Sequence, residues 1–562
     1  MITVDDLHAV PLFKELPDGE AATVASRLAD VRLREGEWLL HEGEQASFFM
    51  LLEGRLELFK VVHGIERKLD EYEVGTYFGE VPLLLGSPAI ASLRAKLPSR
   101  VAQLDQNEFR AMFAECSTFR GELLAMMTRR IARLQTLAQT EPPPTATIVG
   151  HRYDIACHQL RDFLQRNRVV FKWADPTVPS DGAPTPREGD RFPMVILPDG
   201  RKLVTPTLRE LAEGLALQTE PNSTAYDVAI VGAGPAGLAA AVYGASEGLS
   251  TLLLEREAPG GQAGTSSRIE NYLGFPTGVA GDELATRALS QARRFGSELL
   301  VARCVDAIVP GFDGNDHTVV LDGGERVRTR SLILASGVTW RELDVPGADA
   351  LVGRGIYYGA ARTEAQGCQG QRVYLVGGGN SAGQAAMFFA NYASQVTMLV
   401  RGPSLAASMS DYLIKQLATK GNIEVRTCAR IIQVHGEHHL ESIVIEDRRT
   451  GTLAVQPAFA VFAFIGADAK TQWLPRVIIR DEQGYVCTGR DVMDLVAQRQ
   501  GTWPLRRDPF LLETSVPGIF AAGDVRHGSV KRVASGVGEG SMAIAFIHQF
   551  LATQAIREPA IA

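Results

Sequence analysis

Short apolar runs alternate with glycine turns over the first part of the chain. Residues 48–52 and 56–62 are apolar stretches of the length of a strand. The turns between such stretches are marked by Gly36, Gly43, Gly54, Gly64 and Gly75. Because several short strands with glycine turns are typical of closed or sandwiched β architectures, residues 1–140 predict a small β-barrel or jelly roll.

A helical period replaces this pattern in residues 119–137. Apolar side chains recur there at helical spacing, at Leu123, Leu124, Met127, Ile131, Leu134 and Leu137. The pattern predicts a helix that either covers the barrel or pairs with a second copy of the chain, and we expect a homodimer. Consecutive prolines at 142–144 then predict an extended linker, because proline cannot continue a helix.

A small α/β unit is predicted in residues 145–220. The predicted elements are strands at 147–149, 169–173 and 193–197 and helices at 156–168 and 208–217. Pro198-Asp199-Gly200 is a turn sequence that closes a hairpin after the third strand. A polar stretch rich in proline and glycine precedes that hairpin.

The strongest local pattern begins at residue 226. A buried strand at 228–231 leads into a GxGxxG turn at 232–237, and an alanine-rich segment and a second strand at 251–254 follow. The first glycine permits the tight turn, the second lets backbone amides approach a pyrophosphate, and the third lets helix and strand pack closely. Glu255 ends the second strand, where a carboxylate accepts hydrogen bonds from ribose hydroxyls. The pattern predicts a dinucleotide site with its pyrophosphate at the helix N-terminus.

A second glycine turn follows further along the chain. Residues 372–376 predict a strand, 377–382 form a GxGxxA turn, and the strand predicted at 396–400 ends in Arg401. An acid at that position favours a free ribose 2′-hydroxyl, whereas a basic residue suits a 2′-phosphate. The pattern favours NADPH over NADH, with a solvated arginine as the alternative interpretation. Two nested nucleotide folds predict FAD in the first and a nicotinamide coenzyme in the second.

Composition narrows the class of protein. The chain has 562 residues, which predicts three or four domains. Its formal net charge of -8 gives no general attraction to nucleic acid or anionic membranes, and no apolar run approaches the length of a membrane span. The first ten residues lack the basic start and long apolar core of a signal peptide. Six scattered cysteines without any CxxC predict a cytoplasmic protein with no disulfide framework and no metal site.

Residues 10–138 resemble a cyclic-nucleotide-binding domain of the catabolite-activator type. The resemblance is sharpest at 78–95, which matches the family's phosphate-binding cassette. It implies that Glu80 accepts the ribose hydroxyl of a cyclic nucleotide. The family's arginine and its serine or threonine, which hold the cyclic phosphate, are replaced here by Ala89 and Ile90.

These replacements weaken the expected cyclic-nucleotide site. A buried phosphate needs a charge-assisted donor, and a methyl group supplies none. One interpretation is that Arg94 or Arg100 reaches the phosphate from elsewhere. The other is a degenerate barrel used for dimerisation or docking. The sequence after Leu137 contains no recognition helix, so transcription-factor activity is not supported.

The middle unit resembles a thioredoxin or a glutaredoxin. Pro193 stands where that family has a cis-proline before its third strand, but the family's CxxC is missing. Cys157 lies near the start of the first predicted helix, where a thiol pKa can be lowered. It is either a single reactive thiol or a small core residue. A redox domain and a structural adaptor are both open interpretations.

Residues 225–555 resemble a low-molecular-weight thioredoxin reductase. The motifs that carry the resemblance, besides the two glycine turns, are Gly260-Gly261-Gln262, Glu270-Asn271, Leu334-Ala335-Ser336-Gly337, the segment 518–525 and Arg532-Val533-Ala534. The resemblance implies that FAD lies at Gly232, Gly234, Pro235, Ala236, Glu255, Gly261, Gln262, Asn271, Asp524, Arg532, Val533 and Ala534. It implies that NADPH lies at Gly377, Gly379, Asn380, Ser381 and Arg401. The implied FAD-binding domain comprises 225–343 and 469–562, and the NADPH-binding domain comprises 344–468.

The chain departs from that family at the dithiol. Gly359 and Arg362 stand where the family has the two cysteines of its CxxC, so a dithiol relay at this place is excluded. The family's paired arginines are reduced to Arg401, which Gly402-Pro403 follows. An insertion at 488–509 either lines a site or caps a surface. Ferredoxin-NADP reductases of the thioredoxin-reductase type also lack the CxxC.

The sequence therefore predicts a multidomain α/β protein with two nested Rossmann-like domains, a β-barrel domain and a small thioredoxin-like domain. The favoured function is an FAD-dependent NADPH oxidoreductase that passes electrons to an unidentified, non-dithiol acceptor. The N-terminal barrel is a candidate regulatory domain of this enzyme. Tyr357, Tyr358 and Arg362 are candidate residues beside the vacated dithiol. One alternative is a non-catalytic sensor that binds flavin and nucleotide, and a weaker alternative is a disulfide reductase that uses Cys157.

Overall fold

The computed structural model divides into two compact units, Met1–Pro143 and Pro144–Ala562. The residues that the structure describes are 2–14, 16–62, 65–85, 87–115, 123, 145–177, 190–266, 268–312, 314–359, 365, 367–498 and 503–555. The predicted helix at 119–137, apart from Leu123, lies outside these residues, as do the proline linker and Arg362.

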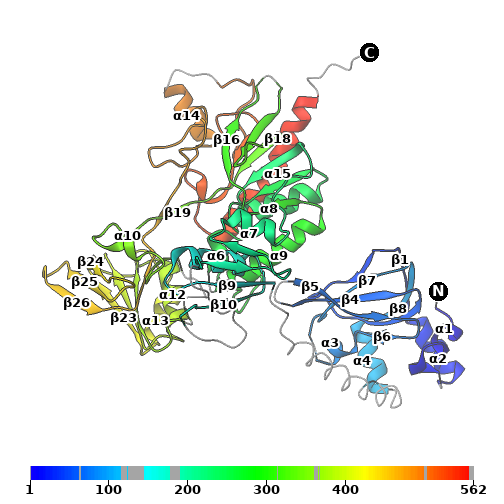
Figure 1. The fold of residues 1–562 in the computed structure, drawn as a ribbon. Helices are drawn as coiled ribbons and strands as arrows, with labels where there is room; N and C mark the ends of the chain where they lie inside the picture. Colours follow the sequence, from blue (N-terminus) through cyan, green and yellow to red (C-terminus); the bar gives the residue numbers. More distant parts are fainter. Residues whose placement is uncertain are drawn as a thin grey trace. The chain divides into compact units, whose positions relative to one another are not determined.

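Two four-stranded antiparallel sheets form the first unit, as the glycine-punctuated strand pattern predicts (Figure 1). The first sheet has the order β1 (Ala29–Leu33), β8 (Ser99–Leu104), β3 (Phe48–Glu53), β6 (Tyr77–Phe78). The second has the order β2 (Trp38–Leu40), β7 (Ser92–Ala95), β4 (Leu56–Val62), β5 (Ile65–Tyr72). The helices are α1 (Val4–His8), α2 (Asp18–Ser26), α3 (Glu80–Leu85) and α4 (Gln106–Glu115), with a short 3-10 turn at Pro11–Phe13.

The alternation of side chains along β3 divides the core of this unit. Phe48 and Met50 pack in one apolar cluster with residues of α1, α2 and α4. Phe49 and Leu51 belong to a second cluster, which takes side chains from both sheets. Successive residues of a strand point to opposite faces, so one apolar strand supplies both clusters.

The second unit begins with a small mixed sheet, which we call the middle domain together with its two helices. Its strand order is β10 (Phe171–Ala174), β9 (Ala146–Val149), β11 (Met194–Ile196), β12 (Lys202–Val204). The helices are α6 (Ile155–Arg166) and α7 (Leu208–Gly214). Strands β9 and β10 are parallel, and β11 is antiparallel to both β9 and β12. All five predicted elements are present, and the peptide bond before Pro193 is cis.

Polar side chains fix where these two helices begin. Asp154 caps α6 by accepting a hydrogen bond from the amide of Cys157 at 2.7 Å. Thr207 and Glu210 form a reciprocal capping box at the start of α7. Each cap satisfies amides that the first helical turn leaves unpaired.

A seven-stranded sheet forms the first of two larger lobes. Its order is β15 (Glu298–Leu300), β14 (Thr251–Leu254), β13 (Ala225–Val231), β18 (Arg326–Leu334), β17 (His317–Leu321), β16 (Val305–Val309), with β29 (Ile519–Ala521) also pairing with β18. Its helices are α8 (Pro235–Ser246), α9 (Gly281–Arg294) and α15 (Val533–Ala555) (Figure 1). The long strand β18 pairs with β17 through its first half and with β29 through its last three residues. Within the described residues, no helix combines the length and the apolar character that crossing a bilayer requires.

A second lobe is inserted into the first. Its parallel sheet has the order β20 (Ile356–Tyr358), β27 (Ala460–Ala463), β21 (Arg372–Val376), β22 (Gln395–Val400), β23 (Ile423–Thr427). Helices α10 (Ala348–Leu351), α12 (Asn380–Phe389) and α13 (Asp411–Ala418) accompany it, as does an antiparallel sheet of β24 (Ala429–His435), β25 (Ser442–Asp447) and β26 (Leu453–Pro457). The chain enters through β19 (Thr339–Trp340) and leaves through β28 (Ala467–Asp468), which pair with each other. The ion pair between Arg341 and Asp468 at 2.7 Å joins the same two crossings.

The insertion at 488–509 packs on the first lobe. It contains α14 (Arg490–Gln498) and Trp503, which contacts a small apolar cluster that includes Val492. Arg507 forms an ion pair at 2.6 Å with Glu513, whose side chain is fully buried. Of the two interpretations of the insertion, these contacts favour a surface cap.

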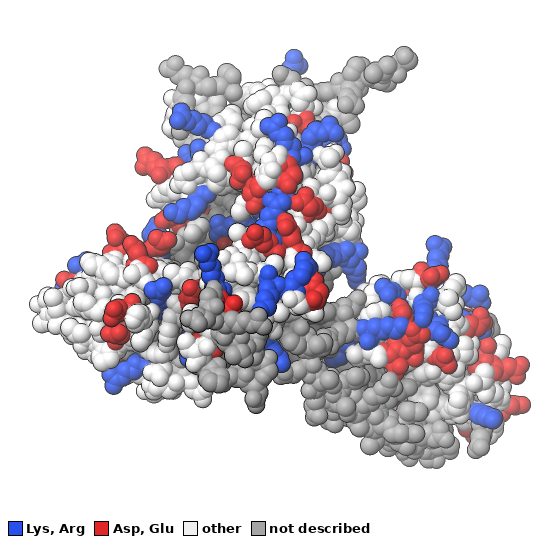
Figure 2. All heavy atoms as spheres, in the orientation of Figure 1, with Lys and Arg blue, Asp and Glu red and all other residues white. Residues whose placement is uncertain are grey.

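Charged side chains of both signs are mixed over the visible surface. On the face drawn in Figure 2, Lys and Arg stand among Asp and Glu over the described residues. The charge pattern on this face therefore does not single out a site, and the candidate site must be built from local geometry.

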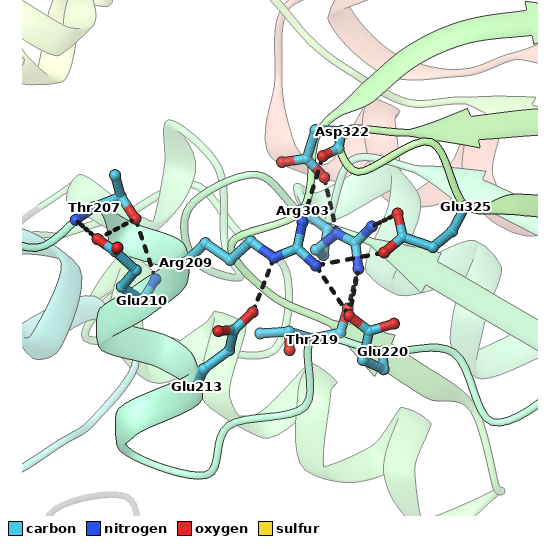
Figure 3. A network of polar contacts seen from close by, with 9 residues as sticks. All are labelled: Thr207, Arg209, Glu210, Glu213, Thr219, Glu220, Arg303, Asp322 and Glu325. Carbon is cyan, nitrogen blue, oxygen red and sulfur yellow. Dashed lines mark hydrogen bonds and ion pairs between the residues drawn. The ribbon is translucent and has the colours of Figure 1, made fainter.

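Arg303 joins the first lobe to the segment that follows the middle domain (Figure 3). Its side chain is fully buried, donates to the carbonyl oxygen of Thr219 at 2.6 Å, and pairs with Asp322 and Glu325 at 2.8 and 2.7 Å. Glu220 lies 3.3 Å from the same guanidinium. A buried charge is tolerated when its donors all meet acceptors, so this network holds residues 219–220 against the hairpin after β17.

Replacement of Arg303 by Met should lower the free energy of unfolding by about 3 kcal/mol, because it leaves Asp322 and the carbonyl oxygen of Thr219 without their cation and leaves Glu220 and Glu325 paired with Arg209 alone. Arg330→Met is the matched control, since the exposed Arg330–Asp227 pair at 3.0 Å should contribute less than about 1 kcal/mol. Urea unfolding of both variants measures the difference. Equal losses in the two variants would contradict the role given to Arg303.

Candidate functional site

The first glycine turn is shaped by close backbone contacts. A Cβ atom at Gly232, whose φ is 105°, would lie 2.4 Å from the carbonyl oxygen of Ala335. A Cβ atom at Gly237 would lie 1.8 Å from the carbonyl oxygen of Gly232. At Gly234, however, a Cβ atom would meet nothing within 4 Å. The fold requires the first and third glycines, and the second opens onto free space at the start of α8, as a pyrophosphate site demands.

Several predicted FAD residues converge on this turn from distant parts of the chain. The Cβ position of Gly261 lies 3.1 Å from Gly234 Cα, which brings the neighbouring Gln262 to the turn. A Cβ atom at Gly523 would lie 3.0 Å from Ala236 Cβ, so the next residue, Asp524, also lies near the glycine turn. A Cβ atom at Gly536, in the first turn of α15, would lie 3.7 Å from the amide nitrogen of Ala236, so the helix that Val533 and Ala534 begin has its N-terminal end beside the same turn.

Glu255 lies in the interior at the end of β14. Its carboxylate accepts hydrogen bonds from the amides of Ala233 at 2.8 Å and Glu257 at 3.0 Å. Burial raises the pKa of Glu255, while these amides and the positive charge of Arg166 act in the opposite direction. A buried carboxylate beside the glycine turn fits the ribose of a dinucleotide, because ribose hydroxyls are hydrogen-bond donors.

Asp524 is half-buried in a 3-10 turn between β29 and α15. Burial raises the pKa of its carboxyl, and Lys531 opposes that shift. The neighbouring amide of Gly523 donates to Glu539 at 2.6 Å, which fixes the turn. A carboxyl group in this position suits a hydroxyl-rich part of a ligand.

Two predicted FAD residues are not drawn into this cluster. Asn271 and Arg532 are both exposed, and the Arg532 guanidinium donates to the carbonyl oxygen of Lys531 at 3.1 Å. Their roles therefore stay predictions. Gln262 is held differently, because its side-chain amide donates to the carbonyl oxygen of Val338.

The second glycine turn repeats the geometry of the first. Gly377 has a φ of 143°, and a Cβ atom there would lie 2.5 Å from the carbonyl oxygen of Phe464. A Cβ atom at Gly379 would have only the carbonyl oxygen of Ser408, at 3.9 Å, within range. Ser381 is exposed at the start of α12. This turn likewise leaves free space at a helix N-terminus, which fits the pyrophosphate of a nicotinamide coenzyme.

Asn380 has a structural task within the second turn. Its amide group donates to Ser410 Oγ at 3.0 Å and its oxygen accepts from the amide of Ser410 at 2.8 Å. Ser410 is the residue that precedes α13. Asn380 thus ties the starts of α12 and α13 together, and its predicted coenzyme contact stays a prediction.

Arg401 lies exposed at the end of β22, and the structure adds two arginines beside it that the sequence analysis missed. Arg448 donates to the carbonyl oxygen of Arg401 at 3.4 Å. Arg449 donates to the hydroxyl of Thr427, the last residue of β23. All three arginines are exposed at the same sheet edge. The Asp-Arg-Arg-Thr-Gly turn is the only local signal, and nothing in it points to the end of β22.

Gly359, where the sequence analysis expects one cysteine of the family's dithiol, lies at the boundary of the two lobes. A Cβ atom at Gly359 would lie 3.5 Å from Trp340 Nε1 and 3.8 Å from Thr265 Oγ1. No local sequence pattern singles out Trp340 or Thr265, because they reach Gly359 only through the fold. Arg362 lies outside the described residues.

The two tyrosines beside this position differ in their surroundings. Tyr358 accepts a hydrogen bond from the amide of Leu343 at 2.9 Å, and burial raises its pKa. Tyr357 stacks on Phe462, with ring centroids 5.1 Å apart, and lies 5.7 Å from the ring of His158 in the middle domain. Tyr358 thus anchors the backbone, and Tyr357 joins the second lobe to α6.

Cys157 is fully buried in the core of the middle domain. Burial raises the pKa of its thiol to about 11, with a smaller opposing effect from Arg161. The expectation of a lowered thiol pKa at this helix N-terminus is therefore wrong for Cys157, because desolvation of the thiolate outweighs the effect of the helix. The core interpretation of Cys157 agrees with this position.

The cassette of the first unit also differs from the sequence expectation. Glu80 is buried at the start of α3. Arg94 pairs with Glu57 at 3.1 Å and stacks on Phe59, and Arg100 pairs with Asp6 and Asp30, both at 3.0 Å. Both guanidiniums are thus committed to other partners.

Lys60, on β4, is a further cation that contacts the cassette. Its ammonium donates to the carbonyl oxygen of Ile90 and pairs with Glu42 at 2.8 Å. The sequence analysis did not name it, because β4 and the cassette meet only in the folded sheet.

The chain is similar to known proteins in two regions. Residues 226–540 match the family described as pyridine nucleotide-disulphide oxidoreductase, and residues 30–116 match the cyclic nucleotide-binding domain. A thioredoxin reductase from Bacillus subtilis (strain 168) is 31% identical over 327 residues, which are 58% of this chain and 95% of that protein.

Solved structures give the same picture. Thioredoxin reductase from Lactococcus lactis, in its FR conformation, has a TM-score of 0.52 and 27% identity, and the match covers 58% of this chain and 99% of that chain. Thioredoxin reductase from T. acidophilum also has a TM-score of 0.52 and 27% identity, with 59% and 100% covered.

Replacement of Gly234 by Ala should leave the fold intact and weaken FAD binding. Its φ is −72° and a Cβ atom would touch no protein atom, but the methyl group would stand where the pyrophosphate must approach. We expect a Kd at least about thirtyfold higher, which corresponds to about 2 kcal/mol of overpacking. Gly421→Ala is the control, because it too meets nothing within 4 Å and lies before β23, away from both turns. Calorimetry with FAD decides, and unchanged affinity in Gly234→Ala would contradict the assignment.

Proposed function

Because the chain belongs to the pyridine nucleotide-disulphide oxidoreductase family, we propose that it is an FAD-dependent oxidoreductase that passes electrons from NADPH to an acceptor outside its own chain. One observation carries this proposal. Two glycine turns, at Gly234 and Gly379, each leave free space at a helix N-terminus. The first has a buried carboxylate beside it and the second has arginines at the end of the next strand. These surroundings suit FAD and NADPH respectively.

The proposed sites divide the work between the cofactors and the chain. Bound FAD would supply the chemistry that accepts a hydride from a nicotinamide. The residues of this chain would bind and orient the two nucleotides. The glycine turns would admit the pyrophosphates, Glu255 would accept from the adenosine ribose, and Arg401 would attract the 2′-phosphate. None of these tasks requires a protein nucleophile.

We propose that electrons do not pass through a CxxC dithiol within this chain. The sequence has no CxxC, and Gly359 occupies the position of one expected cysteine. Cys157, Cys368 and Cys487 are buried. The weaker alternative, a disulfide reductase that works through Cys157, loses support because a thiol with a pKa of about 11 is almost wholly protonated near neutral pH.

The remaining domains are proposed to regulate or connect rather than to carry electrons. The family match suggests a cyclic nucleotide as the effector of the N-terminal unit, and Lys60, which contacts the cassette and pairs with Glu42, is a candidate cation for its phosphate. We propose domain bounds of 1–140, 145–220, 225–343 with 469–562, and 344–468. The middle domain serves as an adaptor of thioredoxin-like topology, and the assembly is a homodimer in a cytoplasmic location.

A sensor that binds flavin without turnover is the second candidate function. The observation that favours it is the pair of altered sites, in which Ala89 and Ile90 replace the phosphate-binding residues of the cassette and Gly359 replaces a redox cysteine. The oxidoreductase and the sensor differ in one measurable respect, the reduction of bound flavin by a nicotinamide.

Anaerobic mixing of the FAD-loaded protein with NADPH or NADH tests the proposed function. We expect rapid loss of the visible flavin absorbance with NADPH, because the two sites lie in one nested fold. Stopped-flow absorbance measures the rate, and a mixture without nicotinamide is the control. Bound flavin that stays oxidised with both donors would favour the sensor. Failure to bind FAD after reconstitution would overturn the proposal.

Arg448 should contribute to coenzyme preference. Its guanidinium lies at the end of β22 beside Arg401, where a second cation would attract a 2′-phosphate. Arg448→Ala should raise the KM for NADPH about fivefold and leave the KM for NADH nearly unchanged, a loss typical of one exposed ionic contact. Arg430→Ala is the matched control, because Arg430 is an exposed arginine on β24 that pairs with Glu446. Equal changes for both coenzymes would contradict this role.

A further inference from the structure

The C-terminal end of α6 lies against the segment that carries Glu255. Arg166, the last residue of α6, pairs with the carboxylate of Glu257 at 3.0 Å and donates to the carbonyl oxygen of Ala258 at 3.3 Å. Asn167 donates to the carbonyl oxygen of Glu257 at 3.1 Å. Only 18% of the Arg166 side chain is exposed. The middle domain therefore grips residues 257–258 through two side chains and three polar contacts.

These contacts continue to the glycine turn. The amide of Glu257 donates to one oxygen of Glu255 at 3.0 Å, and the amide of Ala233 donates to the other at 2.8 Å. The amide of Gly260 donates to the carbonyl oxygen of Ala233 at 2.7 Å, so the loop after Glu257 returns to the same turn. A displacement of Glu257 would thus move a donor to the carboxylate that faces the ribose.

We propose that Arg166 is a positioning residue for the adenosine half of FAD, supplied by the middle domain. This inference rests on the proposed function. The guanidinium of Arg166 contacts Asp162, Glu257 and Ala258, and it acts on Glu255 through its charge and by holding Glu257, whose amide donates to Glu255. The family match begins only at residue 226, so this support comes from a domain that precedes the matched region.

The charges around Glu255 agree with this role. Burial raises the pKa of Glu255, and Arg166 is the cation that acts against that rise. Although burial lowers the pKa of Arg166, the carboxylates of Asp162, Glu257 and Glu255 raise it above its usual value. The guanidinium therefore stays charged, and it favours the ionised form of the carboxylate that accepts from the ribose.

A docking contact without any role in FAD binding is the competing explanation, and Arg168 separates the two. Arg168 lies two residues further on, pairs with Asp282 at 3.0 Å and donates to Thr286 Oγ1 at 3.2 Å. It joins the same two domains, but it reaches α9 and not the segment after β14. Loss of docking alone should affect both arginines alike, whereas loss of positioning should affect only Arg166.

The test compares FAD and ADP binding to the full-length apoprotein in the variants Arg166→Met, Arg166→Gln, Arg166→Lys and Arg168→Met. We expect the Kd for FAD and for ADP to rise about tenfold in Arg166→Met and Arg166→Gln, since loss of one charge-assisted contact typically has this size. Lys keeps the positive charge and should restore most of the affinity. Arg168→Met should bind both ligands as the unaltered chain does. Thermal unfolding of each apoprotein shows which variants are folded.

A second readout is the rate of flavin reduction by NADPH at saturating FAD. It should be unchanged in the Arg166 variants, because adenosine lies at the far end of FAD from the reacting ring. Folded Arg166→Gln with normal FAD and ADP affinity would overturn the inference, as would equal weakening in Arg168→Met. If the unaltered chain binds FAD and either of these two contradicting outcomes is found, only the inference fails and the proposed function stands. If the unaltered chain binds no FAD after reconstitution, the proposed function fails first and the inference with it.

Discussion

Close approach between backbone segments at the first glycine turn sets the geometry of the first lobe. Helix α8 packs so tightly on β13 that a Cβ atom at Gly237 would overlap a carbonyl oxygen, and α15 packs so tightly on α8 that one at Gly540 would lie 2.1 Å from the carbonyl oxygen of Ala236. All buried residues of α8 except Leu238 are glycine or alanine for this reason. The same tightness leaves Gly234 as an opening at the helix start. Packing and nucleotide access thus follow from one constraint.

Local patterns predicted this part of the molecule well. A glycine turn is encoded by neighbours in the chain, so the strands at 251–254 and 372–376 appear where the sequence placed them. The ionic contacts around the turn could not be predicted in the same way. Arg448 is 47 residues from its partner Arg401, Arg303 is 84 from Thr219, and Arg166 is 91 from Glu257. The periodicity of apolar residues carries no information about such pairs. An arginine that is paired across the fold has the same local sequence pattern as one that is exposed to solvent.

Buried charges occur where segments distant in the chain must be held together. Arg303 binds the connection after the middle domain, and Arg166 binds the segment after β14. Each is surrounded by carboxylates and carbonyl oxygens, since an unpaired guanidinium would be costly in the interior. Cys157 is buried and needs no charged partner because its thiol stays neutral, and it packs in the core of the middle domain. The sequence alone could not separate a reactive thiol from a core thiol, since the separation depends on burial.

A dithiol site and a nucleotide site differ in how many residues they need. A dithiol needs two thiols at one exposed place, so the loss of either cysteine abolishes it. This sequence contains no CxxC. A nucleotide site is distributed over a turn, a strand end and a helix start, and these same residues build the lobe. Loss of the turn at Gly232 or Gly377 would break backbone contacts of the fold itself. Retention of the turns alone is therefore weak support for turnover. Open space around a glycine is not specific by itself, since Gly421 in a loop has it as well. The position of Gly234 at the start of α8, beside the buried carboxylate of Glu255, is stronger support, because a pyrophosphate and its ribose need both features together.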